Sequence, residues 1–147
     1  MNYAVIDLGS NSVRLSAYKY DNDNLPVMIF SRKEIAGLAG YVSDGKLEDE
    51  GILKACDVLN DFKRTASNYT ETPNLHVFAA ASLRNIENTD EAVKIITEKT
   101  ALVPDVPEGN EEAALCFSAV CCWAKLTQTI RIFGLRPTVS SRIFCAV

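Results

Sequence analysis

The segment from Tyr3 to Ala17 constrains the fold most, because its pattern predicts one strand, a tight turn and a second strand. Apolar residues run to Ile6, a carboxylate follows at Asp7, and alternation of apolar and polar residues resumes at Val13. The connection, residues 9–12, has the sequence Gly-Ser-Asn-Ser. Small side chains and successive backbone N–H groups in such a turn form a concave nest that favours an anion.

Asp7 gives this turn a specific chemistry. Beside the nest, its carboxylate would repel a bare phosphate, so a divalent cation or an attacking water is expected between the two. The alternative is an ordinary β-turn, because glycine, serine and asparagine populate turns for conformational reasons alone. Taken by itself, this stretch leaves both interpretations open.

The following segments predict a mixed sheet. A third strand is predicted at 26–30, a flexible glycine-rich loop at 35–45, an amphipathic helix at 48–69 and a buried strand at 75–79. A strand, helix and strand after a three-stranded meander require a right-handed crossover. The chain is therefore expected to be an α/β domain, and 48% apolar residues in 147 suffice for one core.

The later segments extend this sheet. A helix is predicted from Thr89 to Lys99, followed at 101–107 by a proline-containing strand that suits an edge position. Residues 108–117 are predicted to form a helix capped by Asn110.

Two side-chain positions near strand ends are candidates for chemistry. Ligands bind at the carboxyl ends of strands in such sheets, and Arg84 follows the strand at 75–79 with a planar fork of donors suited to phosphate oxygens. Glu111 and Glu112 fall in the first turn of a helix, whose dipole keeps a carboxylate ionised and able to deprotonate a water. The alternatives are a surface arginine at a helix entrance and plain acidic capping.

Three motifs resemble one known family. Asp-Leu-Gly-Ser-Asn-Ser-x-Arg-Leu at residues 7–15 resembles the first phosphate loop of the exopolyphosphatase and guanosine pentaphosphate phosphatase (Ppx/GppA) family, in the actin-like ATPase and sugar kinase superfamily. Leu83-Arg84-Asn85 is similar to the family's Ala-Thr-Ser-Ala-x-Arg element, with alanine at 80 or 81 in place of threonine. Gly-Asn-Glu-Glu-Ala is similar to its Ser-Gly-x-Glu-Glu-Ala motif, with Glu108 in place of serine.

The resemblance covers Tyr3 to about Val120 and implies both a fold and a site. The fold is a ribonuclease H-like lobe with a five-stranded mixed sheet flanked by helices. Mg²⁺ would be held by Asp7, and Glu112 would activate the water that releases orthophosphate from polyphosphate or guanosine pentaphosphate. Arg14 would assist if its side chain faces the site. The resemblance implies a phosphate-binding set of Gly9, Ser10, Asn11, Ser12 and Arg84.

The charge pattern suggests a boundary near residue 120. The first 120 residues hold 11 basic and 19 acidic side chains, a net charge of −8, whereas residues 121–147 hold basic residues and no acidic ones. The family's second phosphate loop, Asp-x-Gly-Gly-Gly-Ser-Thr-Glu, does not occur. We therefore expect an N-terminal lobe at 1–120 and a divergent tail at 121–147, non-native or frame-shifted, in a truncated and inactive phosphohydrolase. The alternatives are a non-catalytic interaction domain and a sugar kinase or actin-like ATPase lobe.

The remaining composition limits location and partners. The sequence shows no signal peptide and no apolar window long enough to span a membrane, so a cytoplasmic protein with reduced cysteines is expected. A net charge of −4 argues against a nucleic-acid-binding surface. The lobe is expected to expose a face meant for a partner lobe, with contributions from Phe117, Val120 and Trp123, and a homodimer is one assembly that would cover it.

Overall fold

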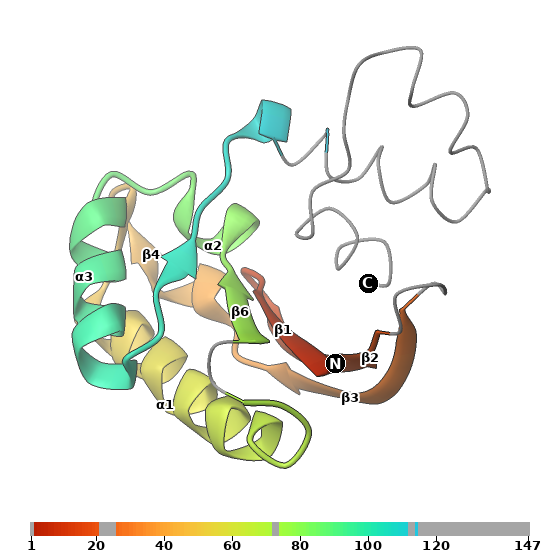
Figure 1. Ribbon diagram of the computed structural model, residues 1–147. Helices are drawn as coiled ribbons and strands as arrows, with labels where there is room; N and C mark the ends of the chain where they lie inside the picture. Colours follow the sequence, from red (N-terminus) through yellow and green to blue (C-terminus); the bar gives the residue numbers. More distant parts are fainter. Residues whose placement is uncertain (1, 21–25, 72–73, 112–113, 115–147) are drawn as a thin grey trace.

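The computed structural model describes residues 2–20, 26–71, 74–111 and 114, and this part of the chain contains an α/β domain built on a five-stranded sheet (Figure 1). The strand order is β3-β2-β1-β6-β7. These strands are β1 (Asn2–Leu8), β2 (Ser12–Lys19), β3 (Val27–Ile35), β6 (Leu75–Phe78) and β7 (Pro104–Asp105).

The sheet is mixed, as predicted. β1 pairs antiparallel with β2, and β2 pairs antiparallel with β3. On its other side β1 pairs parallel with β6, which pairs parallel with β7 at the edge. The proline-containing strand therefore occupies the edge position expected from its sequence. The three strands that run in the same direction side by side are β1, β6 and β7.

Two long helices, α1 (Asp49–Ala66) and α3 (Thr89–Thr100), lie side by side against one face of the sheet (Figure 1). Both were predicted from their apolar spacing. The first turn of α1 carries Asp49 and Glu50, and its last turn carries Lys63 and Arg64, which complements the helix dipole. No helix in the described ranges is long and apolar enough to cross a membrane.

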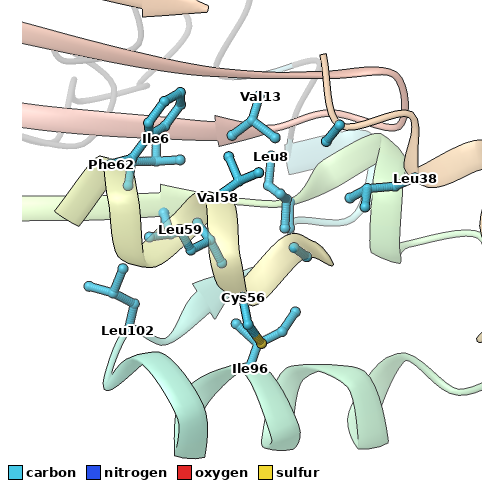
Figure 2. Close-up of a cluster of buried hydrophobic side chains, with 14 of the residues drawn as sticks. Ile6, Leu8, Val13, Leu38, Cys56, Val58, Leu59, Phe62, Ile96 and Leu102 are labelled. Carbon is cyan, nitrogen blue, oxygen red and sulfur yellow. The ribbon is translucent and has the colours of Figure 1, made fainter. Parts of the chain in front are cut away.

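The core lies between the sheet and these helices (Figure 2). Ile6, Leu8 and Val13 project from β1 and β2 toward α1, and Phe62 of α1 is fully buried beside Ile6. Cys56 lies where α1 faces α3, and it is a free thiol. Burial raises the pKa of the Cys56 thiol, so it stays protonated and acts as a small apolar side chain.

The segment predicted as a flexible loop at 35–45 is structured, which corrects that prediction. β3 extends to Ile35, and a 3₁₀ helix, η1 (Leu38–Tyr41), leads into a short hairpin of β4 (Val42–Ser43) and β5 (Lys46–Leu47). Asp44 and Gly45 at the hairpin turn have φ of 49° and 75°. Two successive positive φ values are typical of the type I′ turn, which matches the twist of a hairpin.

Candidate active site

The segments that carry the predicted site residues all follow the carboxyl ends of neighbouring parallel strands. β1 leads into residues 9–12, which we name the Gly-Ser-Asn-Ser loop. β6 leads into the short helix α2 (Ala80–Leu83) and Arg84, and β7 leads to the segment at 108–111. Adjacent parallel strands have their carboxyl ends on the same side of the sheet, and ligands of open α/β sheets bind there.

The Gly-Ser-Asn-Ser loop is closed by a backbone hydrogen bond from Gly9 N–H to the Ser12 carbonyl oxygen, at 3.1 Å. Glycine is required here, because a Cβ on Gly9 would lie 2.6 Å from that same oxygen. The sequence folds locally this way because strand alternation stops at Leu8, resumes at Val13, and leaves a connection of small polar residues between the two.

The backbone of this loop is held from one side. The Ser10 carbonyl oxygen accepts a hydrogen bond from Ala39 N–H at 2.8 Å, and the Asn11 carbonyl oxygen accepts from Gly37 at 2.8 Å and from Ala36 at 3.1 Å. In a trans peptide the C=O and the following N–H point in opposite directions. The next N–H groups along the chain therefore point away from residues 36–39, an arrangement that suits an anion on the opposite side.

Asp7 lies one residue before the end of β1 with an exposed side chain. Ile6 and Leu8 enter the core, so alternation directs Asp7 to the opposite face of the sheet. Arg14 is its direct partner in the β1–β2 ladder, and Phe78 is its partner on β6. Directly opposed residues lie on the same face, so the arginine shares the face of the Asp7 carboxylate.

The donor set at Asp7 suits a hard cation. Mg²⁺ takes oxygen ligands and is commonly held by one or two carboxylates together with waters and substrate phosphates. Asp7 offers one exposed carboxylate beside a loop with serine hydroxyls, which fits this pattern. Within the described ranges, no cluster of three or more His, Cys, Asp or Glu side chains gathers to hold a metal ion.

Arg84 follows α2 directly and is half-buried. α2 is anchored to β1 by Ser82, whose buried hydroxyl donates a hydrogen bond to the Leu8 carbonyl oxygen. Leu83, between Ser82 and Arg84, is fully buried in the core. These two anchors hold the arginine's segment against the end of β1, next to the Gly-Ser-Asn-Ser loop.

The segment at 108–111 begins a helical turn two residues earlier than a cap at Asn110 predicts. Helical geometry starts at Gly109, and the Glu108 N–H donates to the Glu111 carboxylate Oε2 at 3.2 Å. A glutamate three residues into a helix that reaches back to the cap residue's N–H forms half of a capping box. The cap position is therefore Glu108, and the prediction of Asn110 as the cap is wrong. Glu112, Phe117, Val120 and Trp123 lie outside the described residues.

Sequence reasoning missed Ser82 as a contributor to this region. It is the only polar residue in the sequence from Val77 to Leu83, and a polar residue inside an apolar run indicates a specific hydrogen-bond partner. That signal was available, but the partner lies 74 residues away and has no sequence signature.

Comparison with known proteins identifies the family. Residues 17–132 match the model of the Ppx/GppA phosphatase family. The chain belongs to this family. Its relatives include exopolyphosphatase 1 of Mycobacterium tuberculosis, 27% identical over 124 residues that cover 84% of this chain and 36% of the relative. A guanosine-5′-triphosphate,3′-diphosphate pyrophosphatase of Aliivibrio fischeri is 28% identical over 120 residues, covering 80% of this chain and 24% of the relative.

Solved structures confirm the fold class. The Ppx/GppA phosphatase of Aquifex aeolicus superposes with a TM-score of 0.75 at 25% identity, covering 85% of this chain and 41% of that structure. An exopolyphosphatase of Cytophaga hutchinsonii superposes with a TM-score of 0.72 at 24% identity, covering 82% and 38%. The chain thus has the predicted ribonuclease H-like, actin-like ATPase lobe, and it spans about two fifths or less of the length of these family members.

Proposed function

We propose that this Ppx/GppA chain forms the first lobe of an exopolyphosphatase-like phosphohydrolase, which releases terminal phosphate from inorganic polyphosphate or guanosine pentaphosphate. One observation carries the proposal: the Gly-Ser-Asn-Ser loop, Arg84 and the segment at 108–111 all follow the carboxyl ends of the adjacent parallel strands β1, β6 and β7. The names of the relatives agree with this substrate class. The proposal assigns residues 1–120 to the lobe and the acid-free residues 121–147 to a tail, although the family match continues to 132.

In this proposal the phosphate oxygens are bound by backbone and side-chain donors from two strands. The N–H groups of the Gly-Ser-Asn-Ser loop and the hydroxyls of Ser10 and Ser12 face the anion from the end of β1. Arg84 adds two parallel donors from beyond β6, a geometry that matches phosphate and gives charge-assisted hydrogen bonds. Donors fixed before the substrate arrives need no reorganisation during the reaction.

Asp7 is the proposed ligand of Mg²⁺, which when bound would neutralise charge on the phosphate oxygens. The carboxylate lies on the same face of the sheet as Arg14, so two opposite charges border the loop. Glu112 is the proposed general base that takes a proton from the attacking water. The Glu111 carboxylate is already used to accept the Glu108 N–H, which supports the assignment of the base to its neighbour. The proposed setting is the cytoplasm.

A binding experiment tests the proposal. Arg84→Ala is expected to weaken Mg²⁺-dependent binding of polyphosphate about tenfold or more, because a bidentate charged contact is lost. Arg84→Lys should recover only part of the affinity, since lysine lacks the planar fork. The matched control is Arg64→Ala, because Arg64 is an exposed arginine of α1 that pairs with its helix neighbour Asp61. Equal calorimetric titrations of all three variants would contradict a phosphate site at Arg84.

A further inference from the structure

The η1 helix, the β4–β5 hairpin and Asn88 together connect the two halves of the candidate site, and we name this set the brace. At its start, the Ala39 N–H donates to the Ser10 carbonyl oxygen of the Gly-Ser-Asn-Ser loop at 2.8 Å. At its end, the Gly45 carbonyl oxygen accepts from Glu87 N–H at 2.8 Å. Glu87 lies three residues after Arg84, so the brace touches the segments of both proposed phosphate contacts.

Within the brace, the Asn88 side chain makes two hydrogen bonds to the backbone of Leu47. Its Oδ1 accepts a hydrogen bond from Leu47 N–H at 3.0 Å, and its Nδ2 donates to the Leu47 carbonyl oxygen, also at 3.0 Å. The amide thus pairs with Leu47 as a neighbouring strand would. Leu47 is buried, so both of its backbone groups need partners, and Asn88 supplies them.

The position of Asn88 in the chain shows that this contact replaces another one. Asn88 is the N-cap residue of α3, where an asparagine side chain usually accepts a hydrogen bond from the first turn of its own helix. Here the side chain makes no such bond. The amide reaches across to the hairpin instead of stabilising the start of its helix.

Local hydrogen bonds from Thr89 also fix the conformation of the segment between Arg84 and Asn88. The Thr89 hydroxyl donates to the Ile86 carbonyl oxygen at 2.8 Å and contacts the Leu83 carbonyl oxygen as well. Leu83 is fully buried. The short connection that begins with Arg84 is therefore fixed at its start by Leu83 and at its end by the hairpin.

We propose that Asn88 is a positioning residue that fixes Arg84 relative to the Gly-Ser-Asn-Ser loop through the brace. Removing its amide frees the Glu87 end of the connection, so Arg84 samples positions in which its guanidinium no longer meets the bound phosphate. Small displacements of a binding group have large effects on a bound substrate. The inference rests on the proposed role of Arg84 in phosphate binding.

The first measurement is amide hydrogen exchange on the 147-residue chain. Asn88→Ser keeps a good N-cap residue for α3 but removes both contacts to Leu47. We expect exchange of the Leu47 and Glu87 amides to accelerate about tenfold, with the α1 amides of Leu59 and Phe62 unchanged. The matched control is Asn68→Ser, because the exposed Asn68 amide donates to the Thr65 carbonyl oxygen of the preceding turn. Unchanged exchange at Leu47 and Glu87 would overturn the proposal.

The second measurement separates positioning from general stability. Asn88→Ser is expected to weaken polyphosphate binding about fivefold in the wild-type background, and to have no further effect in an Arg84→Ala background. Equal losses in both backgrounds, or no loss in either, would overturn the role of Asn88. If Asn88→Ser does not fold, Asn88→Asp replaces it. The aspartate keeps the helix cap and the acceptor for the Leu47 N–H, but it cannot donate to the Leu47 carbonyl oxygen. It is likewise expected to weaken polyphosphate binding in the wild-type background and to have no further effect in the Arg84→Ala background.

The two proposals fail in different ways. If the wild-type chain does not bind polyphosphate, the proposed function is wrong, whereas the brace is still decided by exchange at Leu47 and Glu87. If polyphosphate binding depends on Arg84 but not on Asn88, the proposed phosphate site is supported and the positioning role of Asn88 is wrong.

Discussion

The antiparallel and parallel halves of the sheet contribute to the candidate site in different ways. The β1–β2 ladder joins seven residue pairs, whereas β1–β6 joins four and β6–β7 joins two. The antiparallel half and the residues that follow β3 hold the Gly-Ser-Asn-Ser loop through backbone hydrogen bonds. The parallel half delivers Arg84 and the segment at 108–111 from short ladders, and it relies on the side chains of Ser82 and Asn88 for its anchorage. One half supplies a fixed backbone, and the other supplies functional side chains that need separate support.

The largest expected effect concerns Glu112, which follows the segment at 108–111 in the sequence. In a chain joined to the second lobe of a solved family member, Glu112→Gln should lower phosphate release by about 10²–10⁴, the usual contribution of a positioned general base. Glu111→Gln is the matched control, because an uncharged Gln side chain still offers an oxygen to the Glu108 N–H. Initial rates of orthophosphate release measure both variants. If Glu111→Gln loses activity and Glu112→Gln keeps it, the two roles are reversed.

In the antiparallel half, Gly9→Ala should cost the most stability. A Cβ at 2.6 Å from the Ser12 carbonyl oxygen forces the loop to open, and we expect a loss of about 3 kcal/mol in the free energy of unfolding. Gly40→Ala is the control, because a Cβ there meets nothing within 4 Å. Urea denaturation followed by circular dichroism compares the two. Equal stability would show that the loop backbone is not held as described.

The link between the halves is tested by Ser82→Ala. The substitution leaves the Leu8 carbonyl oxygen without its hydroxyl donor in a buried setting, which should cost about 1–2 kcal/mol in unfolding free energy. Ser67→Ala removes a hydroxyl that donates to the Arg64 carbonyl oxygen at an exposed site and should change little. The same denaturation experiment measures both. A cost at Ser82 no larger than at Ser67 would mean that α2 is held by apolar packing alone.

The smallest expected effect is at the edge strand of the antiparallel half. Arg32 pairs with Asp61 of α1 at 2.8 Å and lies 5.3 Å from the centre of the Phe62 ring. The Arg32 and Asp61 side chains are partly exposed, so Arg32→Ala should cost about 0.5–1 kcal/mol, less at high salt. Arg64→Ala, at the more exposed pair, should cost less still. If Arg32→Ala costs more unfolding free energy than Ser82→Ala, this partly exposed ion pair stabilises the fold more than the buried Ser82 hydrogen bond does, which contradicts the expected order.

Periodicity predicted the elements that bury a continuous apolar stripe. The helices at 49–66 and 89–100 and the strands around Asp7 and His76 follow from alternation or from three- and four-residue spacing. The hairpin at 42–47 was missed because its strands have two residues each, too few to alternate, although Asp44-Gly45 is a common type I′ pair.

The contacts that organise the site could not be predicted from local pattern. Ser82 meets Leu8 across 74 residues, and Asn88 meets Leu47 across 41. Asn88 has the sequence signature of an ordinary helix cap, which hides its contact with the hairpin. The cap at Glu108 depends on the hydrogen bond that its N–H donates to the Glu111 carboxylate, whereas the residue types alone favoured Asn110.

The central claim is that the Gly-Ser-Asn-Ser loop and Arg84 bind one phosphate group together. Titration of the isotope-labelled 147-residue chain with Mg²⁺ and polyphosphate, followed by amide chemical shifts, tests this directly. We predict that Asn11, Ser12 and Arg84 shift together with one dissociation constant, while Lys63 and Arg64 at the far end of α1 do not move. Shifts confined to Lys63 and Arg64, or different constants for the loop and Arg84, would contradict a shared site.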